Sequence, residues 1–270
     1  RPLASADIAI TTRVPISAAT LAQCPRLRLI AVFAIGTDMV DLAACRERGV
    51  QVCNVPAASN EAVAEHAIAL FFALRRNIVG AHNTLVNTED WVKTGNLTPT
   101  FGGLPGTCRE EVMGIIGAGE LGNRVATIAR ALGMRVLLSA RKNPTTTSTT
   151  TPPDRTPFTT LLSTSTIIIL TCPLTPSTKN LISAPEFSLM LPSALLINVA
   201  RGGIVDEEAL VAALKEKKLK GAASDVFVEE PAGEGNSALL REMKRGDGEL
   251  QGRVVVSPHV AWYARSSIEK

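Results

Sequence analysis

The chain has 270 residues, of which 46% are hydrophobic and 20% are charged, and its formal net charge is +3. A chain of this length and apolar content can bury a substantial core, and we expect two domains of ordinary size. The basic residues are scattered along the sequence, which excludes the clustered positive surface of a nucleic-acid-binding protein. Small anionic molecules are therefore the expected partners.

The five cysteines form no CxxC pair and have no zinc-ligand spacing, so we expect neither a disulfide framework nor a metal site. This pattern is typical of a reducing compartment, and we predict a cytoplasmic location. We expect no membrane span, because the longest near-apolar run, residues 62–74, contains Glu65 and His66. The sequence starts abruptly at Arg1, a few residues before the strand-like residues 8–10, and it stops at Lys270, eleven residues after His259, so we expect truncation at both ends.

Short β-rich runs alternate with helical patterns along the chain. Most runs are apolar throughout, as parallel strands covered on both faces require. They occupy residues 29–33, 50–55, 112–116, 135–139, 166–170, 195–199 and 254–257. The helical patterns lie at residues 61–76, 121–132 and 207–217, the last with Asp206 as its expected N-cap. This alternation predicts an α/β fold.

Three segments depart from this alternation. Residues 61–76 are apolar on nearly all sides, which favours a buried helix at a domain or subunit interface over a ligand site. The threonine-rich residues 144–160 are expected to form a flexible surface insertion. Residues 233–252 are polar, and we expect a surface loop or a short helix there.

A glycine-rich turn, Gly117-Ala118-Gly119-Glu120-Leu121-Gly122, lies between the predicted strand at 112–116 and the predicted helix at 121–132. The first glycine permits a tight turn, the second lets the backbone approach a pyrophosphate, and the third allows close packing of helix on strand. The helix N-terminus also offers free N–H groups to an anion. This context favours a dinucleotide-binding loop over glycines that serve only as turn formers.

The strand after this turn ends at Ser139, where a dinucleotide-binding strand normally ends in an acidic residue that binds the ribose. Arg141 and Lys142 stand there instead. A carboxylate would repel a 2′-phosphate, whereas Arg141 can bind one through two hydrogen bonds and Lys142 adds charge. We therefore predict NADP as the cofactor. NAD is the alternative, if both cations are only solvated surface groups.

Three further blocks follow in order, at residues 198–206, 224–231 and 257–262. They resemble the signature blocks of the D-isomer-specific 2-hydroxyacid dehydrogenases, as do residues 34–42, 54–56, 63–66 and 172–175. The resemblance covers nearly the whole chain. It implies a Rossmann-type doubly wound parallel sheet plus a smaller, flavodoxin-like α/β domain. Residues 1–80 and 258–270 would bind substrate, and residues 81–257 the dinucleotide.

Reduction of a 2-keto acid needs a cation for the carboxylate, a proton donor for the new alkoxide and a hydride from the cofactor. Arg201, just past a buried strand, supplies the cation, and Gly202 and Gly203 leave room for substrate. His259 follows a predicted strand end, where α/β sites form, and its protonated ring can donate. By the resemblance, Glu230 is the partner of His259, with neighbouring Glu229 as the second candidate.

The resemblance assigns further residues by their position in the blocks. Ile35 and Gly36 would present backbone N–H groups to the substrate carboxylate, and Asp225 would lie near the nicotinamide carboxamide. Cys172, Pro173 and Thr178 would line the adenosine side of the cofactor, and Val199 and Ala200 the nicotinamide side. His66 and His82 are expected to be a packing residue and a surface residue.

Trp262 and residues 11–15 most resemble the glycerate dehydrogenase, or hydroxypyruvate reductase, branch. Phosphoglycerate enzymes carry an arginine and a serine where Thr11 and Thr12 stand, so we expect hydroxypyruvate, glyoxylate or D-glycerate as substrate. A phosphoglycerate-type dehydrogenase stays an alternative because Arg13 could reach the site. Formate enzymes place a glutamine at the position of Glu230, which argues against that branch.

A binding protein is the alternative of a different class. Nucleotide-sensing corepressors resemble the same fold and blocks, although no residue in the sequence favours this interpretation. We expect a homodimer formed through the dinucleotide domain, a small 2-keto acid as the substrate, and neither nucleic acid nor membrane as a partner.

Overall fold

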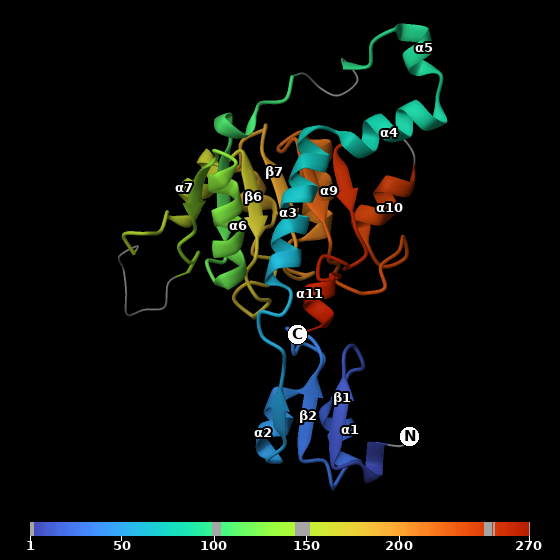
Figure 1. The fold of residues 1–270 in the computed structure, drawn as a ribbon, viewed down its shortest axis with the longest axis vertical. Coiled ribbons are helices and arrows are strands. Elements are labelled where there is room, and N and C mark those ends of the chain that lie inside the picture. The colour runs from blue at the N-terminus through green and yellow to red at the C-terminus, as the bar shows by residue number, and fades with distance from the viewer. Residues whose placement is uncertain (1–2, 99–103, 144–151, 246–249, 251, 270) are drawn as a thin grey trace. The chain divides into compact units, whose positions relative to one another are not determined.

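The computed structural model describes residues 3–98, 104–143, 152–245, 250 and 252–269. The chain divides into two compact units, which are described separately (Figure 1). The smaller unit comprises Arg1–Ser59 and Tyr263–Lys270, and the larger comprises Asn60–Trp262. Among the described residues, no helix is both long and apolar enough to cross a membrane. The five cysteines are free thiols.

The smaller unit contains a parallel sheet of three strands in the order β1-β2-β3. Its strands are β1 (Ile8–Thr11), β2 (Leu29–Val32) and β3 (Gln51–Cys53), and its helical segments are η1 (Leu3–Ser5), α1 (Ala18–Ala22), α2 (Leu42–Glu47) and α11 (Arg265–Ile268). Asp41 caps α2 by accepting a hydrogen bond from the Ala44 N–H at 3.0 Å. Leu21 and Ile30 lie fully buried in its core.

The larger unit contains a parallel sheet of six strands in the order β5-β4-β6-β7-β8-β9. These are β4 (Val112–Ile116), β5 (Arg135–Leu138), β6 (Ile167–Leu170), β7 (Leu195–Asn198), β8 (Gly221–Ser224) and β9 (Val254–Val256). From β4 the chain moves outward to β5 and then returns to β6 on the other side of β4. Such a reversal of strand order is where α/β sheets bind ligands, beyond the carboxyl ends of the strands. The predicted doubly wound parallel sheet is confirmed.

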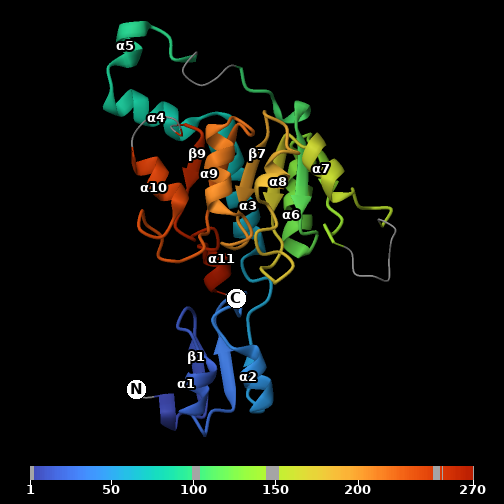
Figure 2. The same cartoon turned by 180° about the vertical axis from the view of Figure 1, so that it is seen from behind.

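Helices cover both faces of the larger sheet (Figures 1 and 2). The helices α3 (Asn60–Arg75) and α6 (Glu120–Ala131) pack on one face; α7 (Phe158–Thr164), α8 (Ala184–Phe187), α9 (Glu207–Lys215) and α10 (Ala238–Arg245) pack on the other. In β6, Ile167 and Ile169 join the first core, whereas Ile168 and Leu170 join the second. Burial on both faces explains why the strands are apolar throughout.

Helix α3 belongs to the larger unit. It packs against α6 and against β7, β8 and β9, which buries residues such as Val63, Phe71 and Leu74 and accounts for its apolar sequence. Residues 60–80 therefore lie in the larger unit, although they were predicted to be part of the substrate-binding domain. Which unit binds which ligand stays a prediction.

Helices α4 (Ile78–Asn87) and α5 (Asp90–Thr94) are among the helices that were not predicted from the sequence. They follow α3 and lie beyond the end of the larger sheet at which α3 ends (Figure 1). They carry exposed apolar side chains, among them Leu85, Val86, Trp91 and Val92. The short helix η3 (Cys108–Glu110) then leads into β4. Within the polar segment 233–252, the short helix α10 confirms that part of the prediction.

The outer edge of β5 carries one additional parallel bridge, between Ser139 and Thr156. The Thr156 N–H donates to the Leu138 carbonyl, and the Ala140 N–H donates to the Thr156 carbonyl, both at 2.8 Å. Rossmann sheets have a third strand at this position. Thr156 therefore occupies the place of that strand. Of the flexible insertion predicted for residues 144–160, residues 144–151 lie outside the described residues. In its described part the prediction is wrong, because Thr156 pairs with β5 and α7 begins at Phe158.

Strand β8 was also missed from the sequence, because Gly-Ala-Ala-Ser has little β propensity. All four of its residues are buried between the two helical layers. A Cβ on Gly221 would lie 2.6 Å from the Arg253 carbonyl oxygen. The close approach of the Arg253 carbonyl thus requires a glycine at position 221, in the strand next to the edge strand β9.

Candidate active site

The glycine-rich turn lies at the carboxyl end of β4, next to the reversal of strand order. Gly117 has φ +111°, and a Cβ there would lie 2.4 Å from the Cys172 backbone nitrogen. A Cβ on Gly122 would lie 2.0 Å from the Gly117 carbonyl oxygen. At Gly119 a Cβ would meet nothing within 4 Å. The first and third glycines are therefore required by the protein's own backbone, whereas the second leaves an open surface.

The open surface at Gly119 adjoins the N-terminus of α6, a helix of 12 residues. The Gly119 carbonyl accepts the N–H of Asn123, the first hydrogen bond of the helix. The N–H groups of the first turn, including those of Glu120 and Leu121, have no partner within the helix and favour an anion. The Glu120 carboxylate accepts a hydrogen bond from Asn60 Nδ2 at 3.1 Å. The backbone N–H groups of the first turn of α6 thus fit the pyrophosphate of a dinucleotide without any side chain.

The two cations beyond β5 differ in their surroundings. Lys142 Nζ lies 2.8 Å from Oε1 of Glu186, a residue only 5% exposed, and donates to the Leu181 carbonyl. Arg141 is exposed and forms no ion pair with any of the described residues. Ser139 Oγ donates to the Ala140 carbonyl at 2.7 Å. Of the predicted pair, Arg141 is therefore the cation available to a ligand.

The loop after β6 forms the other side of the reversal point. Thr178 Oγ1 donates to the Pro173 carbonyl and accepts the N–H of Thr175, both at 2.7 Å, so this side chain fixes the loop. Cys172 is buried, and burial raises the pKa of its thiol to about 11. The thiol is therefore neutral at physiological pH and serves as an apolar group.

The turn that carries Arg201 follows β7 and is held by Asn198. The Asn198 amide donates to the Arg201 carbonyl at 2.9 Å and accepts the Ala200 N–H at 3.1 Å. Arg201 Nη1 donates to the Ala200 carbonyl at 2.7 Å. Val199 and Ala200 are 5% and 7% exposed. The two residues predicted to line the nicotinamide side thus form a rigid, buried base beneath Arg201.

Gly202 brings this turn against the loop after β8. A Cβ on Gly202 would lie 1.8 Å from the Phe227 carbonyl oxygen. The space at Gly202 is thus filled by the neighbouring loop, and the prediction that it makes room for substrate is wrong. This close approach couples the loop of Arg201 to the loop of Glu230.

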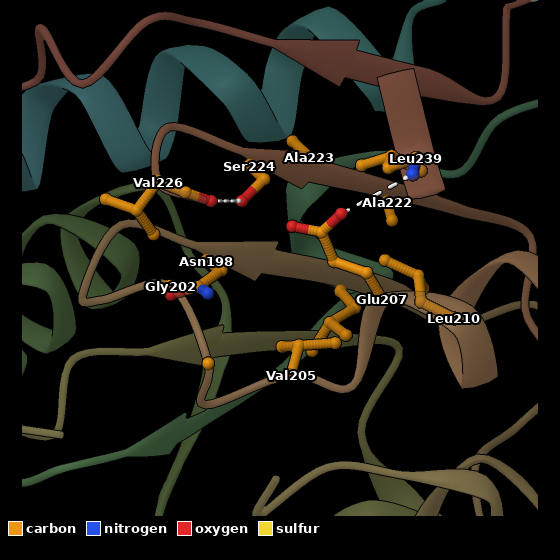
Figure 3. Close-up of a pocket in the computed structure, with 12 residues that line it drawn as sticks. Asn198, Gly202, Val205, Glu207, Leu210, Ala222, Ala223, Ser224, Val226 and Leu239 are labelled. Atoms are coloured by element: carbon orange, nitrogen blue, oxygen red, sulfur yellow. Dashed lines mark hydrogen bonds between the residues drawn. The ribbon is translucent and has the colours of Figure 1, made fainter. Parts of the chain in front are cut away.

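A small pocket lies behind these two loops (Figure 3). Buried side chains of the core line it, including Leu196, Leu210 and Val226, and the Glu207 carboxylate is directed toward α10. Glu207 accepts hydrogen bonds from Ser237 Oγ at 2.7 Å and from the Leu239 N–H at 3.5 Å. This pocket therefore belongs to the packing of α9 and α10, and we assign it no ligand.

Glu230 and His259 meet beyond the ends of β8 and β9. His259 Nδ1 lies 2.6 Å from Glu230 Oε2, and Glu230 Oε1 accepts the Phe227 N–H at 3.0 Å. The two side chains are 31% and 28% exposed, so the pair is accessible. Because a carboxylate only accepts hydrogen bonds, the shared proton belongs to Nδ1, and Nε2 is left to react. Of the two candidate carboxylates, the structure places Glu230 beside His259.

A role of Asp225 was missed from the sequence. Its carboxylate is 1% exposed and accepts the N–H groups of Val260 and Ala261 at 3.0 and 2.9 Å. Its carbonyl accepts the His259 N–H at 2.7 Å. Asp225 thus binds three consecutive N–H groups and holds His259 at φ +53°, a conformation that is strained for most residues. Its predicted contact with the nicotinamide stays a prediction.

Trp262 also contributes to this loop. Its indole Nε1 donates to the His259 carbonyl at 2.8 Å. Trp262, by which the chain resembles the glycerate dehydrogenase branch, therefore helps to fix the backbone of His259.

Ile35 and Gly36 lie in the smaller unit, in the loop after β2. Asn54 Nδ2 donates to the Ile35 carbonyl at 2.7 Å, and the Val55 N–H donates to the Ala34 carbonyl at 3.1 Å. The loop is therefore braced from one side by the segment after β3. Its part in the site stays a prediction.

Known proteins resemble this chain over most of its length. Residues 68–261 match the model of the D-isomer specific 2-hydroxyacid dehydrogenase, NAD binding domain. A glycerate dehydrogenase of Methylorubrum extorquens is 40% identical over 271 residues, which cover 99% of this chain and 79% of the relative. The chain belongs to the D-isomer-specific 2-hydroxyacid dehydrogenases. A glyoxylate reductase of Aeropyrum pernix is 36% identical over 92% of this chain and 70% of its own length.

Solved structures of nicotinamide-dependent enzymes share the fold of this chain. An acyclic imino acid reductase in complex with NADPH and D-Arg has a TM-score of 0.80 and 29% identity, covering 99% of this chain and 79% of that one. A D-lactate dehydrogenase from Aquifex aeolicus, complexed with NAD and lactic acid, has a TM-score of 0.75 and 29% identity, covering 99% and 80%. This dehydrogenase is therefore an oxidoreductase of CH–OH donors that uses a nicotinamide cofactor.

Proposed function

We propose that this dehydrogenase interconverts a small 2-keto acid, hydroxypyruvate or glyoxylate, and the corresponding 2-hydroxy acid, with His259 as the acid–base group. The observation that carries the proposal is the 2.6 Å contact between His259 Nδ1 and Glu230 Oε2, which leaves Nε2 accessible. An imidazole fixed in this way can donate a proton from Nε2 in reduction and accept it in oxidation.

In the reductive direction, a bound nicotinamide supplies the hydride to the keto carbon. Protonated His259 gives its Nε2 proton to the carbonyl oxygen, so the C=O bond becomes CH–OH and the ring becomes neutral. Glu230 balances the positive charge of the ring before this transfer and keeps the proton on Nδ1 afterwards. In oxidation, the neutral ring takes the hydroxyl proton through the same atom.

Arg201 is the cation that we assign to the substrate carboxylate. A guanidinium can hold a carboxylate through two parallel hydrogen bonds and polarise the adjacent carbonyl. The Asn198 side chain fixes the backbone around Arg201, and the approach at Gly202 sets this turn against the loop of Glu230. We assign the larger unit to the cofactor and the smaller unit, through the backbone of Ile35 and Gly36, to the substrate carboxylate.

Two observations support a small substrate. The relatives include a glycerate dehydrogenase and several glyoxylate reductases. Thr11, at the position where phosphoglycerate enzymes carry a cation, is 7% exposed and donates to the Val14 carbonyl. An additional substrate phosphate would therefore find no charge at this position.

The test is the oxidation of NADPH by purified protein with hydroxypyruvate, glyoxylate and phosphohydroxypyruvate, repeated with His259→Ala. We expect the two small acids to have the higher kcat/KM, and His259→Ala to lose turnover while it still binds NADPH. A higher kcat/KM for phosphohydroxypyruvate would refute the substrate assignment. Absence of turnover with every acid would favour the nucleotide-sensing alternative.

We propose NADP as the preferred cofactor, supported by the exposed guanidinium of Arg141 and by the lack of an acidic residue after β5.

We also propose a homodimer, supported by the apolar side chains that α4 and α5 expose. Leu85, Val86, Trp91 and Val92 are each more than half exposed, and a second copy would cover them. Light scattering on purified protein tests the dimer, and a monomeric mass at micromolar concentration would refute it.

A further inference from the structure

We infer that His66, on helix α3, is a positioning residue that fixes the loop of His259 through Ser257 and Asp225. The inference rests on the proposed role of His259 as the acid–base group. His66 is the second histidine near this loop, and the mechanism above does not use it. Its side chain is 26% exposed and lies beside Ser257, where β9 ends and the loop of His259 begins.

The three side chains form a continuous chain of contacts. His66 Nε2 lies 2.9 Å from Ser257 Oγ, and Ser257 Oγ lies 2.6 Å from Asp225 Oδ1. His66 Nε2 is also 3.6 Å from the same carboxylate oxygen. Helix α3, the loop after β8 and the loop after β9 are therefore joined at one point.

The direction of these hydrogen bonds follows from the proton count. The Asp225 carboxylate accepts two backbone N–H groups and can only accept from Ser257 as well. Ser257 has a single hydroxyl proton, which it gives to Asp225, so its oxygen must accept from His66. The proton of His66 therefore sits on Nε2, and His66 acts as the donor at the start of the chain.

The chain ends on the backbone that sets the His259 ring. Asp225 holds the N–H groups of residues 259–261, and the strained φ of His259 needs such restraint. Helix α3 is a rigid anchor because it is buried against β7, β8 and β9. Loss of the His66 donor would leave the Ser257 hydroxyl less firmly oriented toward the buried Asp225 carboxylate and would allow the loop of His259 to shift.

The test compares His66→Leu, which removes the donor, with His66→Gln, whose amide nitrogen is the same number of bonds from Cβ as Nε2. We expect kcat with hydroxypyruvate to fall about tenfold in the leucine variant, because misplacement of a reacting group is costly. The KM for NADPH should stay unchanged, since the glycine-rich turn lies at the end of β4. The glutamine variant should keep most of the wild-type kcat.

Two matched variants sharpen the result. Ser257→Ala should lower kcat as much as His66→Leu, and the double variant should lose no more than either single variant, because both remove one chain of contacts. His82→Leu, at an exposed histidine of α4, should leave kcat unchanged. Equal kcat in wild type and His66→Leu would overturn the inference, as would additive losses in the double variant.

A second readout does not depend on turnover. The chain has three histidines, so labelling histidine with 15N and recording the ring signals resolves each one by comparison with the His82 and His66 variants. We expect a proton on Nε2 of His66, and His259 signals that move in the leucine variant but not in the glutamine variant. A neutral His66 with its proton on Nδ1 would overturn the inference. If wild type reduces no keto acid while these signals behave as expected, the proposed function fails and the positioning contact stands.

Discussion

Glu230 contacts His259 through one carboxylate oxygen and anchors itself to its own loop through the other. Oε2 lies 2.6 Å from His259 Nδ1, and Oε1 accepts the Phe227 N–H at 3.0 Å. The Phe227 N–H thus holds the carboxylate in place independently of its contact with His259. The position of the Glu230 side chain should therefore persist when its charge is removed, so a neutral variant tests the role of the charge alone.

Glu230→Gln should lower kcat about 100-fold while the fold is retained, because the amide no longer balances the protonated ring. The measurement is kcat for hydroxypyruvate reduction, with thermal unfolding as the check on the fold. Glu229→Gln is the matched control, since Glu229 is the exposed neighbour with the same chemistry. Similar losses in both variants would contradict the assignment of Glu230.

Gly202→Ala should destabilise the protein and disturb the site together. The new Cβ would lie 1.8 Å from the Phe227 carbonyl oxygen, a backbone atom that cannot move alone. Overpacking of this kind costs about 1–3 kcal/mol in the free energy of unfolding, measured by urea titration. Gly233→Ala is the control, because a Cβ there meets nothing within 4 Å. An unchanged free energy of unfolding for Gly202→Ala would contradict the close approach.

Gly119→Ala should behave in the opposite way. A Cβ at Gly119 meets no protein atom within 4 Å, so the melting temperature should stay near that of wild type. The methyl group would lie on the surface offered to the pyrophosphate, and we expect the Kd for NADPH to rise at least about tenfold. Fluorescence titration measures this Kd. Tight NADPH binding by the variant would place the pyrophosphate elsewhere.

The features that could be predicted from the sequence are those with local signals. Apolar runs mark strands buried on both faces, the glycine-rich turn has a fixed spacing, and Asp206 caps α9 by accepting the Ala209 N–H at 3.1 Å. Each depends on residues that are close in sequence. The resemblance to a family added the order of the blocks and selected Glu230 and His259 as a pair.

Other features depend on contacts that no local pattern encodes. The ion pair of Lys142 with Glu186 joins residues far apart in the sequence, so Lys142 was predicted to be available to the cofactor although it is paired. Strand β8 escaped prediction because its small residues have little β propensity, and the sequence does not reveal the close approach of the Arg253 carbonyl that requires Gly221. The hold of Asp225 on three backbone N–H groups depends on the path of the loop, which only the fold determines.

The two cations after β5 should respond differently to substitution. Arg141→Ala should raise the KM for NADPH about tenfold and leave the KM for NADH unchanged, because it removes a bidentate partner of the 2′-phosphate. Lys142→Ala should mainly lower stability, since it leaves the carboxylate of Glu186 buried without its cation. Steady-state kinetics with both cofactors and thermal unfolding separate the effects. An NADH preference in wild type would refute the NADP proposal.

Cys172 should resist alkylation in the folded protein, although five free thiols are present. Burial raises the pKa of this thiol from 9.0 to about 11, and the thiolate is the form that reacts. Below pH 9 the neutral thiol contributes to the stability of the folded state, and this contribution to stability is lost as the pH rises toward 11. The reactivity of Cys172 should increase over the same pH interval, because more of the thiol is then ionised. The measurement is iodoacetamide labelling of native protein at pH 8, followed by peptide mass analysis. Cys53, which is exposed, is the internal control, and labelling of Cys172 as fast as Cys53 would contradict the burial of the loop after β6.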